Sequence, residues 1–326
     1  MASINATDSV PELAGLNLFD YIRSVAVIIM FFCMTFYDRR TWLLADIIGS
    51  FLMGAFHLFY PHIYIKNYIA EDDIDNLQCY LVQVFCCNLL ADAAYRFYVR
   101  KSRDHTTISS LVWGRVLTVS LMLMFGIYIR LTPKFYLRAE QFSFVLLGTV
   151  VWLVSSVVQL LRYVSPLGGV EKGGLVTWSL RFEFLVSFVF GLAHIAYPGW
   201  LLGFQVRRAQ LFHRFLLRMV GILRIGLVAF QAQQAIVFRY DKDRNAFFIS
   251  RILAHVLIAI CLGYNFIYED LFNKKELLAS CGLFLNVLPC LLGLLVSLTG
   301  WGRGGNSNRY SGSSYSSYYT RSKTGY

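Results

Sequence analysis

Charged residues are scarce in this chain of 326 residues, because Asp, Glu, Lys and Arg together make up only 15% of it. Ordinary soluble domains carry about 25%. Hydrophobic residues reach 57%, aromatic residues reach 16%, and the mean hydropathy is +0.54. This composition excludes an ordinary soluble domain. It predicts a polytopic membrane protein in contact with the lipid bilayer.

Sequence signatures of catalysis and of cofactor binding are also missing. The chain has no nucleophile elbow, no HExxH motif, no P-loop and no dinucleotide fingerprint. Its seven cysteines form no CxxC pair, which argues against a zinc site or a disulfide framework. The formal net charge is +11, yet no RNA- or DNA-binding module is recognisable. We therefore expect a non-enzymatic protein without a cofactor, a metal or a nucleic-acid partner.

The amino terminus lacks a basic region followed by a cleavage site, so no removable signal peptide is expected. Residues 1–18 are predicted to form an outer polar tail, with a glycosylation pattern at Asn5. Residues 301–326, rich in Gly, Ser and Tyr, are predicted to be a disordered tail. Between the tails lie nine apolar segments of membrane-spanning length. They are residues 19–37, 44–61, 79–98, 110–129, 142–163, 179–198, 213–237, 247–267 and 277–299.

The second and sixth segments share an uncommon pattern. Residues 46–61, DIIGSFLMGAFHLFYP, recur 137 positions later at residues 183–198 as EFLVSFVFGLAHIAYP. Six of the sixteen positions are identical, and the acidic residue Asp46 is matched by Glu183. We interpret this as an internal repeat. The identical pairs are Ser50/Ser187, Phe51/Phe188, Gly54/Gly191, His57/His194, Tyr60/Tyr197 and Pro61/Pro198.

The repeat extends to the fourth and eighth segments. Arg115 aligns with Arg251, and Tyr128 with Tyr264, at an offset of 136 positions. Four spans in each unit would give both copies the same orientation, so the repeat is predicted to be parallel. The expected fold is all-α, with one four-span repeat at 19–130, a second at 142–268 and a ninth span at 277–300.

The repeated polar and small residues fall on one face of their helix. At 100° per residue, Asp46, Ser50, Gly54 and His57 lie within an arc of about 80°. Such a face is typical of helix packing in lipid, but it also suits a polar pathway through the bundle. The histidines could be hydrogen-bonded packing residues, a proton-sensitive switch, or ligands of a haem or metal. The candidate pathway residues are Ser50, His57, Ser187 and His194.

Four charged residues are predicted to pair within the membrane. Asp46 and Arg115 lie a few residues inside the cytosolic ends of their spans, and Glu183 and Arg251 repeat this arrangement. Because an unpaired charge within the bilayer costs about 2.5–3.5 kcal/mol, we predict two ion pairs, Asp46–Arg115 and Glu183–Arg251. These pairs either fix the packing of the helices or form a gate or a proton-coupled site.

The third segment is the most polar of the nine. It contains Gln83, Asn88 and Asp92, and we therefore expect it to be buried among the other helices. Asp92 and Arg96 are predicted to reach the depth of the ion pairs in the first half only. The corresponding positions in the second half are Ala229 and Gln233.

Basic residues in the loops predict the orientation of the chain. With the amino terminus outside or in a lumen, the inner loops and tail hold fifteen Lys and Arg residues, against nine in the outer loops. The carboxyl terminus is then cytosolic. The chain could lie in an endomembrane or in the plasma membrane.

Each half resembles small four-span membrane families, such as DoxX-like proteins and the tumour-suppressor-inducible four-span proteins. The resemblance depends on His57-x-x-Tyr60-Pro61, its second copy at 194–198, and the spacing of the spans that follow. It implies a four-span helical unit and brings no activity or functional residue.

Besides a membrane redox or haem protein with His57 and His194 as ligands, two functions remain open from the sequence. The first is a non-enzymatic multi-pass membrane protein that acts through assembly with other membrane components, including membrane-protein partners. The second is a transporter or channel with a polar pathway between the two repeats.

Overall fold

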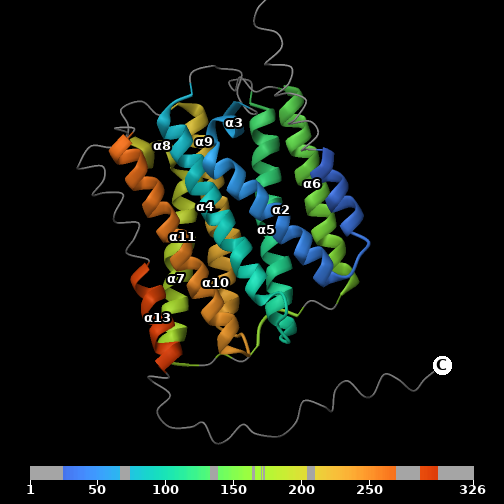
Figure 1. Ribbon diagram of the computed structural model, residues 1–326, viewed down its shortest axis with the longest axis vertical. Helices are drawn as coiled ribbons and strands as arrows, with labels where there is room; N and C mark the ends of the chain where they lie inside the picture. Colours follow the sequence, from blue (N-terminus) through green and yellow to red (C-terminus); the bar gives the residue numbers. More distant parts are fainter. Residues whose placement is uncertain are drawn as a thin grey trace, which may run out of the picture.

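The computed structural model describes residues 25–66, 74–132, 139–163, 166–169, 171, 173–203, 210–268 and 287–299. Over these residues the chain is all-helical and contains no strand (Figure 1). Seven helices are long and apolar enough to cross a membrane, as the composition predicts. The first and ninth predicted spans are described only as Val25–Met34 and Val287–Thr299. Both predicted tails lie outside the described residues.

The long helices match the second to eighth predicted spans in order. They are α2 (Arg39–Phe59), α4 (Asn76–Val99), α5 (His105–Arg130), α6 (Ala139–Arg162), α7 (Leu175–Ala196), a composite helix, and α11 (Asp241–Tyr268). The composite helix consists of α9 (Leu211–Leu223), the π-helix η1 (Arg224–Ala229) and α10 (Phe230–Ala235). The ninth segment is α13 (Val287–Thr299).

Several helices begin before the predicted spans because aspartate residues cap them. The side chain of Asp38 accepts hydrogen bonds from the backbone N–H groups of Arg40 (3.0 Å) and Thr41 (3.2 Å). Asp75 and Asp104 cap α4 and α5 in the same way. A capping side chain satisfies backbone donors that the first turn leaves free. These first turns are polar, so hydropathy alone does not include them in a span.

The Tyr-Pro pairs end α2 and α7, as the sequence predicts. Tyr60 is the C-cap of α2, and Pro61 begins the six-residue helix α3 (Pro61–Lys66). Tyr197 is likewise the C-cap of α7, and Pro198 begins α8 (Pro198–Gly203). Proline disfavours helical geometry at the residue before it but suits the first turn of a new helix.

Helix α4 lies at the centre of the bundle (Figure 1). It packs against α2 on one face and α11 on another, while α5 packs on α6, and α7 packs on α9, η1 and α13. In its most apolar stretch, 72% of the residues of α4 are buried, which confirms the burial expected for the third span.

The buried apolar residues form two clusters along the bundle, with a polar layer between them. In α4 the first cluster includes residues from Leu77 to Cys87, and the second includes Tyr95 and Val99. Asn88 and Asp92 lie between the two. In α11 the order is reversed, with Arg251 and His255 between the second cluster (246–248) and the first (258–262). The intramembrane charges therefore occupy a layer with apolar core on both sides.

The seventh predicted span is not a continuous α-helix. It contains the π-helix η1, after which the backbone N–H of Phe230 donates to the carbonyl of Ile225. Within η1, Gly226 lies so close to Thr118 of α5 that a Cβ atom at this glycine would collide with the threonine. This close approach depends on the partner helix. The hydrophobic pattern of residues 213–237 therefore does not predict it.

Candidate functional site

The first charge centre consists of Asp46 on α2, Asp92 and Arg96 on α4, and Arg115 on α5. Arg115 Nη2 donates to Asp46 Oδ2 and to Asp92 Oδ2, both at 3.0 Å. Arg96 Nε lies 2.6 Å from Asp92 Oδ2, and its Nη1 lies 3.3 Å from Asp46 Oδ2. All four side chains are buried. Two carboxylates face two guanidinium groups, so the first charge centre is electrically neutral.

Ser50 and Trp152 complete the surroundings of Arg115 and Asp46. Ser50 Oγ accepts a hydrogen bond from Arg115 Nη2 at 3.0 Å. Trp152 Nε1 donates to Asp46 Oδ1 at 2.8 Å, and its ring lies 4.6 Å from the Cζ atom of Arg115. Trp152 was not predicted from the sequence. Membrane tryptophans are enriched at the interfaces. The position of this tryptophan inside a predicted span is therefore unusual, and it could have indicated a role within the bundle.

The second charge centre consists of Glu183 on α7 and Arg251 on α11. Arg251 Nε lies 3.0 Å from Glu183 Oε1, so the structure brings together the second predicted pair as well as the first. Three neutral side chains surround this pair. Asn88 Oδ1 accepts from Arg251 Nη1 at 3.4 Å, Ser187 Oγ donates to Glu183 Oε1 at 3.2 Å, and Cys290 Sγ donates to Glu183 Oε2 at 3.6 Å.

A further arginine, not predicted from the sequence, lies near the second charge centre. Arg224, in η1, is only 4% exposed and interacts electrostatically with Glu183 and Arg251. Its Nε and Nη1 atoms have no hydrogen-bond partner among the described residues, and its Cζ atom lies 5.9 Å from the ring of Phe190. The second charge centre therefore has one ion pair and a further buried arginine in its electrostatic surroundings, in contrast to the neutral first centre.

The four candidate pathway residues do not meet in one cavity. Ser50 and Ser187 belong to the two charge centres, whereas His57 and His194 each bond through Nδ1 to a carbonyl of their own helix, Met53 and Phe190. All four are buried. Within the described residues no group of three His, Cys, Asp or Glu side chains could hold a metal.

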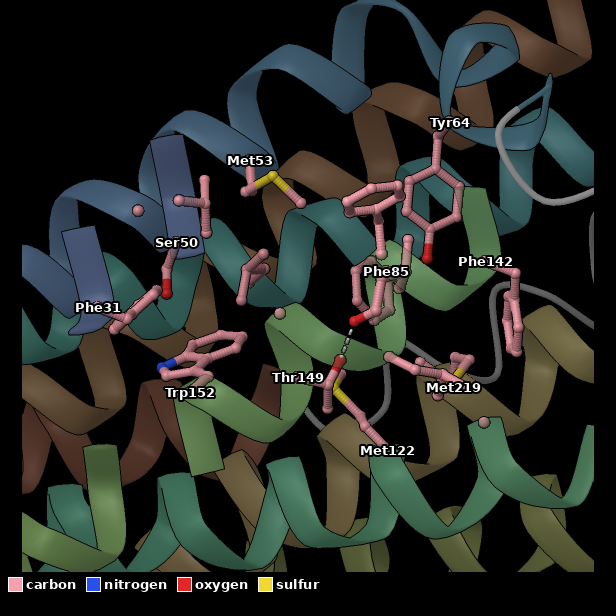
Figure 2. Close-up of a pocket in the computed structure, with 18 of the residues that line it drawn as sticks. Phe31, Ser50, Met53, Tyr64, Phe85, Met122, Phe142, Thr149, Trp152 and Met219 are labelled. Carbon is pink, nitrogen blue, oxygen red and sulfur yellow. Dashed lines mark hydrogen bonds between the residues drawn. The ribbon is translucent and has the colours of Figure 1, made fainter. Parts of the chain in front are cut away.

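An apolar pocket of about 180 Å³ lies beside the first charge centre. Helices α2, α5 and α6 contribute most of its wall. Helix α3 adds one residue, and α4, α9 and the helix Val25–Met34 add two residues each. In Figure 2, Phe31, Ser50 and Trp152 lie at one end, and Tyr64, Phe142 and Met219 lie toward the other. We call this cavity the apolar pocket.

One end of the apolar pocket carries most of its polar groups, while Tyr64 lies toward the other end. Arg115, Ser50 and Trp152 line it there, and Thr149 lies nearby on α6. Arg115 uses Nε and Nη2 within the first charge centre, and Nη1 donates no hydrogen bond to the described residues. The remaining wall is aromatic and aliphatic, and it includes three flexible methionines: Met53, Met122 and Met219.

A second pocket, near Pro61, is larger, at about 690 Å³, but its polar side chains are mostly neutral amides such as Gln83 and Asn265. Asn265 Nδ2 donates to Gln83 Oε1 at 2.8 Å. Neither charge centre contributes to this wall. The apolar pocket therefore has the better combination of enclosure and polar groups that converge at one end.

At the same end of the bundle as α3, a polar link joins the starts of α4 and α9. His213 Nε2 donates to Asp75 Oδ1 at 2.9 Å, while His213 Nδ1 accepts from the backbone N–H of Gln210 at 3.1 Å. This pattern corresponds to a neutral imidazole with its proton on Nε2. Burial raises the pKa of Asp75, but hydrogen bonds from His213 and from the Gln78 backbone outweigh it, and the pKa lies below its usual range.

Residues 44–295 match a family that is described as a domain of unknown function, DUF8292. The matched range includes both charge centres and every residue of the apolar pocket except Val27 and Phe31. No curated protein and no solved structure matches the chain.

Proposed function

We propose, from the premise that this chain belongs to the DUF8292 family, that it is a non-enzymatic multi-pass membrane protein that binds a largely apolar ligand from the bilayer. The observation that carries this proposal is the apolar pocket, which lies in the bundle beside the first charge centre. Ligand sites are typically apolar cavities in which a few polar groups fix the orientation of the ligand.

The volume of the apolar pocket limits how much of a ligand it holds. A protein cavity of about 150 Å³ with apolar walls holds one benzene molecule. At about 180 Å³, the apolar pocket accommodates one ring or a short length of chain. A membrane lipid would therefore place its polar end and the first part of its apolar body here. The methionine side chains can adjust to the shape of that body.

The charge balance of the first charge centre favours a ligand with an uncharged polar end. Asp46 and Asp92 already balance Arg96 and Arg115. A ligand carboxylate or phosphate would add a net charge to a buried neutral site and would lie close to two carboxylates, which is costly in a low-dielectric interior. A hydroxyl or carbonyl group can instead accept a hydrogen bond from Arg115 without a change in net charge.

A pair of photoreactive lipids of equal chain length tests this proposal. One is a long-chain alcohol and the other is the corresponding fatty acid, and each is added to the full chain in nanodiscs. We expect the alcohol to label residues of the apolar pocket more strongly than the fatty acid does. Equal labelling by both lipids, or labelling confined to the lipid-facing surface, would contradict the proposal.

A pocket-filling variant provides the matched control. A Cβ atom at Gly148 meets only Ile28, at 3.8 Å, so Gly148→Leu can extend into the apolar pocket without a backbone clash. Gly263 on α11 has open space around it and lies outside the apolar pocket. We expect Gly148→Leu to abolish labelling by the alcohol and Gly263→Leu to preserve it.

We also propose that the two halves are parallel repeats with the amino terminus outside or lumenal. The matched order of elements supports the repeat, because α2 and α7 are each followed by a six-residue helix that begins with proline. The buried pairs Asp46–Arg115 and Glu183–Arg251 occupy equivalent positions and support it further. Cysteine accessibility at loop positions on the two sides of the membrane tests the orientation.

Assembly with membrane partners and transport along a polar pathway, the two functions expected from the sequence, stay predictions. Ligand binding is compatible with assembly, since a ligand between the helices of the bundle can alter the surface that they offer to a partner. Transport would require water to reach His57 and His194. Because both side chains bond to their own helices, their geometry supports a packing role instead.

A further inference from the structure

A small cavity lies between the two charge centres. Its volume is about 10 Å³, and residues of α4, η1 and α11 line it. The lining includes Asp92 from the first charge centre and Arg251 from the second, together with Asn88, Tyr95 and Ser250. A volume of about 10–15 Å³ on this scale holds one water molecule. The cavity is therefore large enough for one water molecule and is lined by a charged residue from each centre.

Two polar atoms of the residues that line this cavity have no hydrogen-bond partner within the described part of the chain. They are Asp92 Oδ1 and Tyr95 Oη, and both are buried. A buried polar atom without a partner destabilises the folded state, because it has lost its hydrogen bonds to water. One of these atoms is an acceptor and the other is a hydroxyl that can donate. Both belong to residues that line the cavity, so a molecule that accepts from the hydroxyl and donates to the carboxylate would satisfy both atoms.

We propose that one water molecule binds in this cavity and joins the two charge centres into a single hydrogen-bonded network. The water accepts from the Tyr95 hydroxyl and donates to Asp92 Oδ1. Its second proton is donated to Asn88 Oδ1. Asn88 already accepts from Arg251 at 3.4 Å, so the connected groups run from Asp46 through Arg115 and Asp92 to Arg251 and Glu183.

Water fits this cavity better than a metal cation does. Asp92 is already balanced by two arginines of its own centre, and Arg251 brings a further positive charge to the lining of the cavity. A cation would be repelled by these guanidinium groups. A neutral molecule with two donors and two acceptor sites has no such cost and matches the polar groups present.

The sign of the change in Tm caused by Tyr95→Phe shows whether the Tyr95 hydroxyl bonds to a water molecule or to nothing. With water bound, the variant removes one hydrogen bond of the water, and we expect the Tm of the full chain in nanodiscs to fall by about 2 °C or more. Without water, the variant removes a buried hydroxyl that bonds to nothing, so stability should rise or stay unchanged. Either of these last two results would overturn the proposal.

Tyr98→Phe is the matched control for this measurement. Tyr98 lies on the same helix, but its side chain is 62% exposed, so loss of its hydroxyl should leave the Tm unchanged. If Tyr95→Phe does not fold, the wild-type chain decides instead. A high-resolution structure in nanodiscs should show density within hydrogen-bonding distance of Tyr95 Oη and Asp92 Oδ1. An empty cavity, in a map that resolves other internal waters, would refute the proposal.

Energetic coupling between the two centres provides a second test. If Tyr95 had only a local role, its substitution would not change this coupling. Asp46→Asn and Glu183→Gln each neutralise one centre. With the water in place, we expect their Tm shifts to be non-additive in the wild-type background and closer to additive with Tyr95→Phe. Additive shifts in both backgrounds would show that the two centres are not joined.

Discussion

At the residue scale, Arg115 is the side chain that connects the apolar pocket to the first charge centre. It bonds to Asp46, Asp92 and Ser50 and also lines the apolar pocket, where the ring of Trp152 covers its guanidinium group. The planar fork of arginine allows several acceptors to be held at once, which a lysine ammonium group does not reproduce. A ligand that bonds to Arg115 would therefore contact a network that spans α2, α4, α5 and α6.

Removal of Arg115 should destabilise the chain strongly. Arg115→Ala leaves Asp46 and Asp92 buried with Arg96 as the nearest remaining cation, and loss of one partner from a buried charge network costs about 3–5 kcal/mol. We expect a large fall in Tm and in the yield of folded protein. Arg130→Ala, at the exposed end of the same helix, is the control and should change little. Equal stability of the two variants would show that Arg115 is not a buried ion-pair partner.

Asp75 should make stability depend on acidic pH. Its pKa is lowered in the folded state by hydrogen bonds that outweigh the effect of burial. A carboxyl group with a lowered folded pKa contributes stability above its unfolded pKa, about 3.9, and loses it as the pH falls through the folded pKa. The effect should be small, because the side chain is 43% exposed. The Tm of wild type should fall more steeply below about pH 4 than that of Asp75→Asn. Parallel pH profiles would contradict this assignment.

At the element scale, glycines set how closely α7 approaches α9. A Cβ atom at Gly221 would lie 2.8 Å from the carbonyl oxygen of Gly191 and 2.8 Å from the Cβ atom of His194. At Gly191 it would lie 2.6 Å from the side chain of Ile225. Small residues allow such close contact between membrane helices. The repeated glycine and histidine of the sixteen-residue pattern therefore take part in helix packing.

Alanine substitutions at a tightly packed glycine and at an open glycine should have opposite effects on the stability of the chain. Gly221→Ala meets backbone, which cannot rotate away, so we expect a loss of about 1–3 kcal/mol of stability. Gly263→Ala on α11 meets nothing within 4 Å and should be neutral or stabilising, by up to about 1 kcal/mol from helix propensity. Thermal unfolding of both variants measures the difference. A stabilised Gly221→Ala would contradict the packing described for α7 and α9.

Much of this element-level arrangement could be predicted from the sequence. Apolar length located the second to eighth spans, and the Tyr-Pro pairs located the ends of α2 and α7. The repeated charges identified which residues form the pairs, because a buried charge requires a partner. The sequence did not predict the π-helix, since η1 depends on the approach of Gly226 to Thr118 on a distant helix. Trp152 and Arg224 were missed for the same reason, because only tertiary packing brings them to the charge centres.

At the scale of the whole molecule, the two charge centres occupy a layer between two apolar clusters. The first centre is neutral, while the Glu183–Arg251 pair of the second has the buried Arg224 in its electrostatic surroundings. The apolar pocket adjoins the neutral centre, which is the one better able to accept an uncharged polar group. The proposed bridging water would transmit a change at Arg115 to Arg251 in the other half.

Native mass spectrometry of the full chain, purified with its cellular lipids, tests ligand binding in the apolar pocket most directly. The account predicts that wild type retains a neutral lipid bearing a hydroxyl or carbonyl group. The same lipid should be lost from Gly148→Leu and kept by Gly263→Leu. Retention of no lipid by wild type, or equal retention by both glycine variants, would contradict the account.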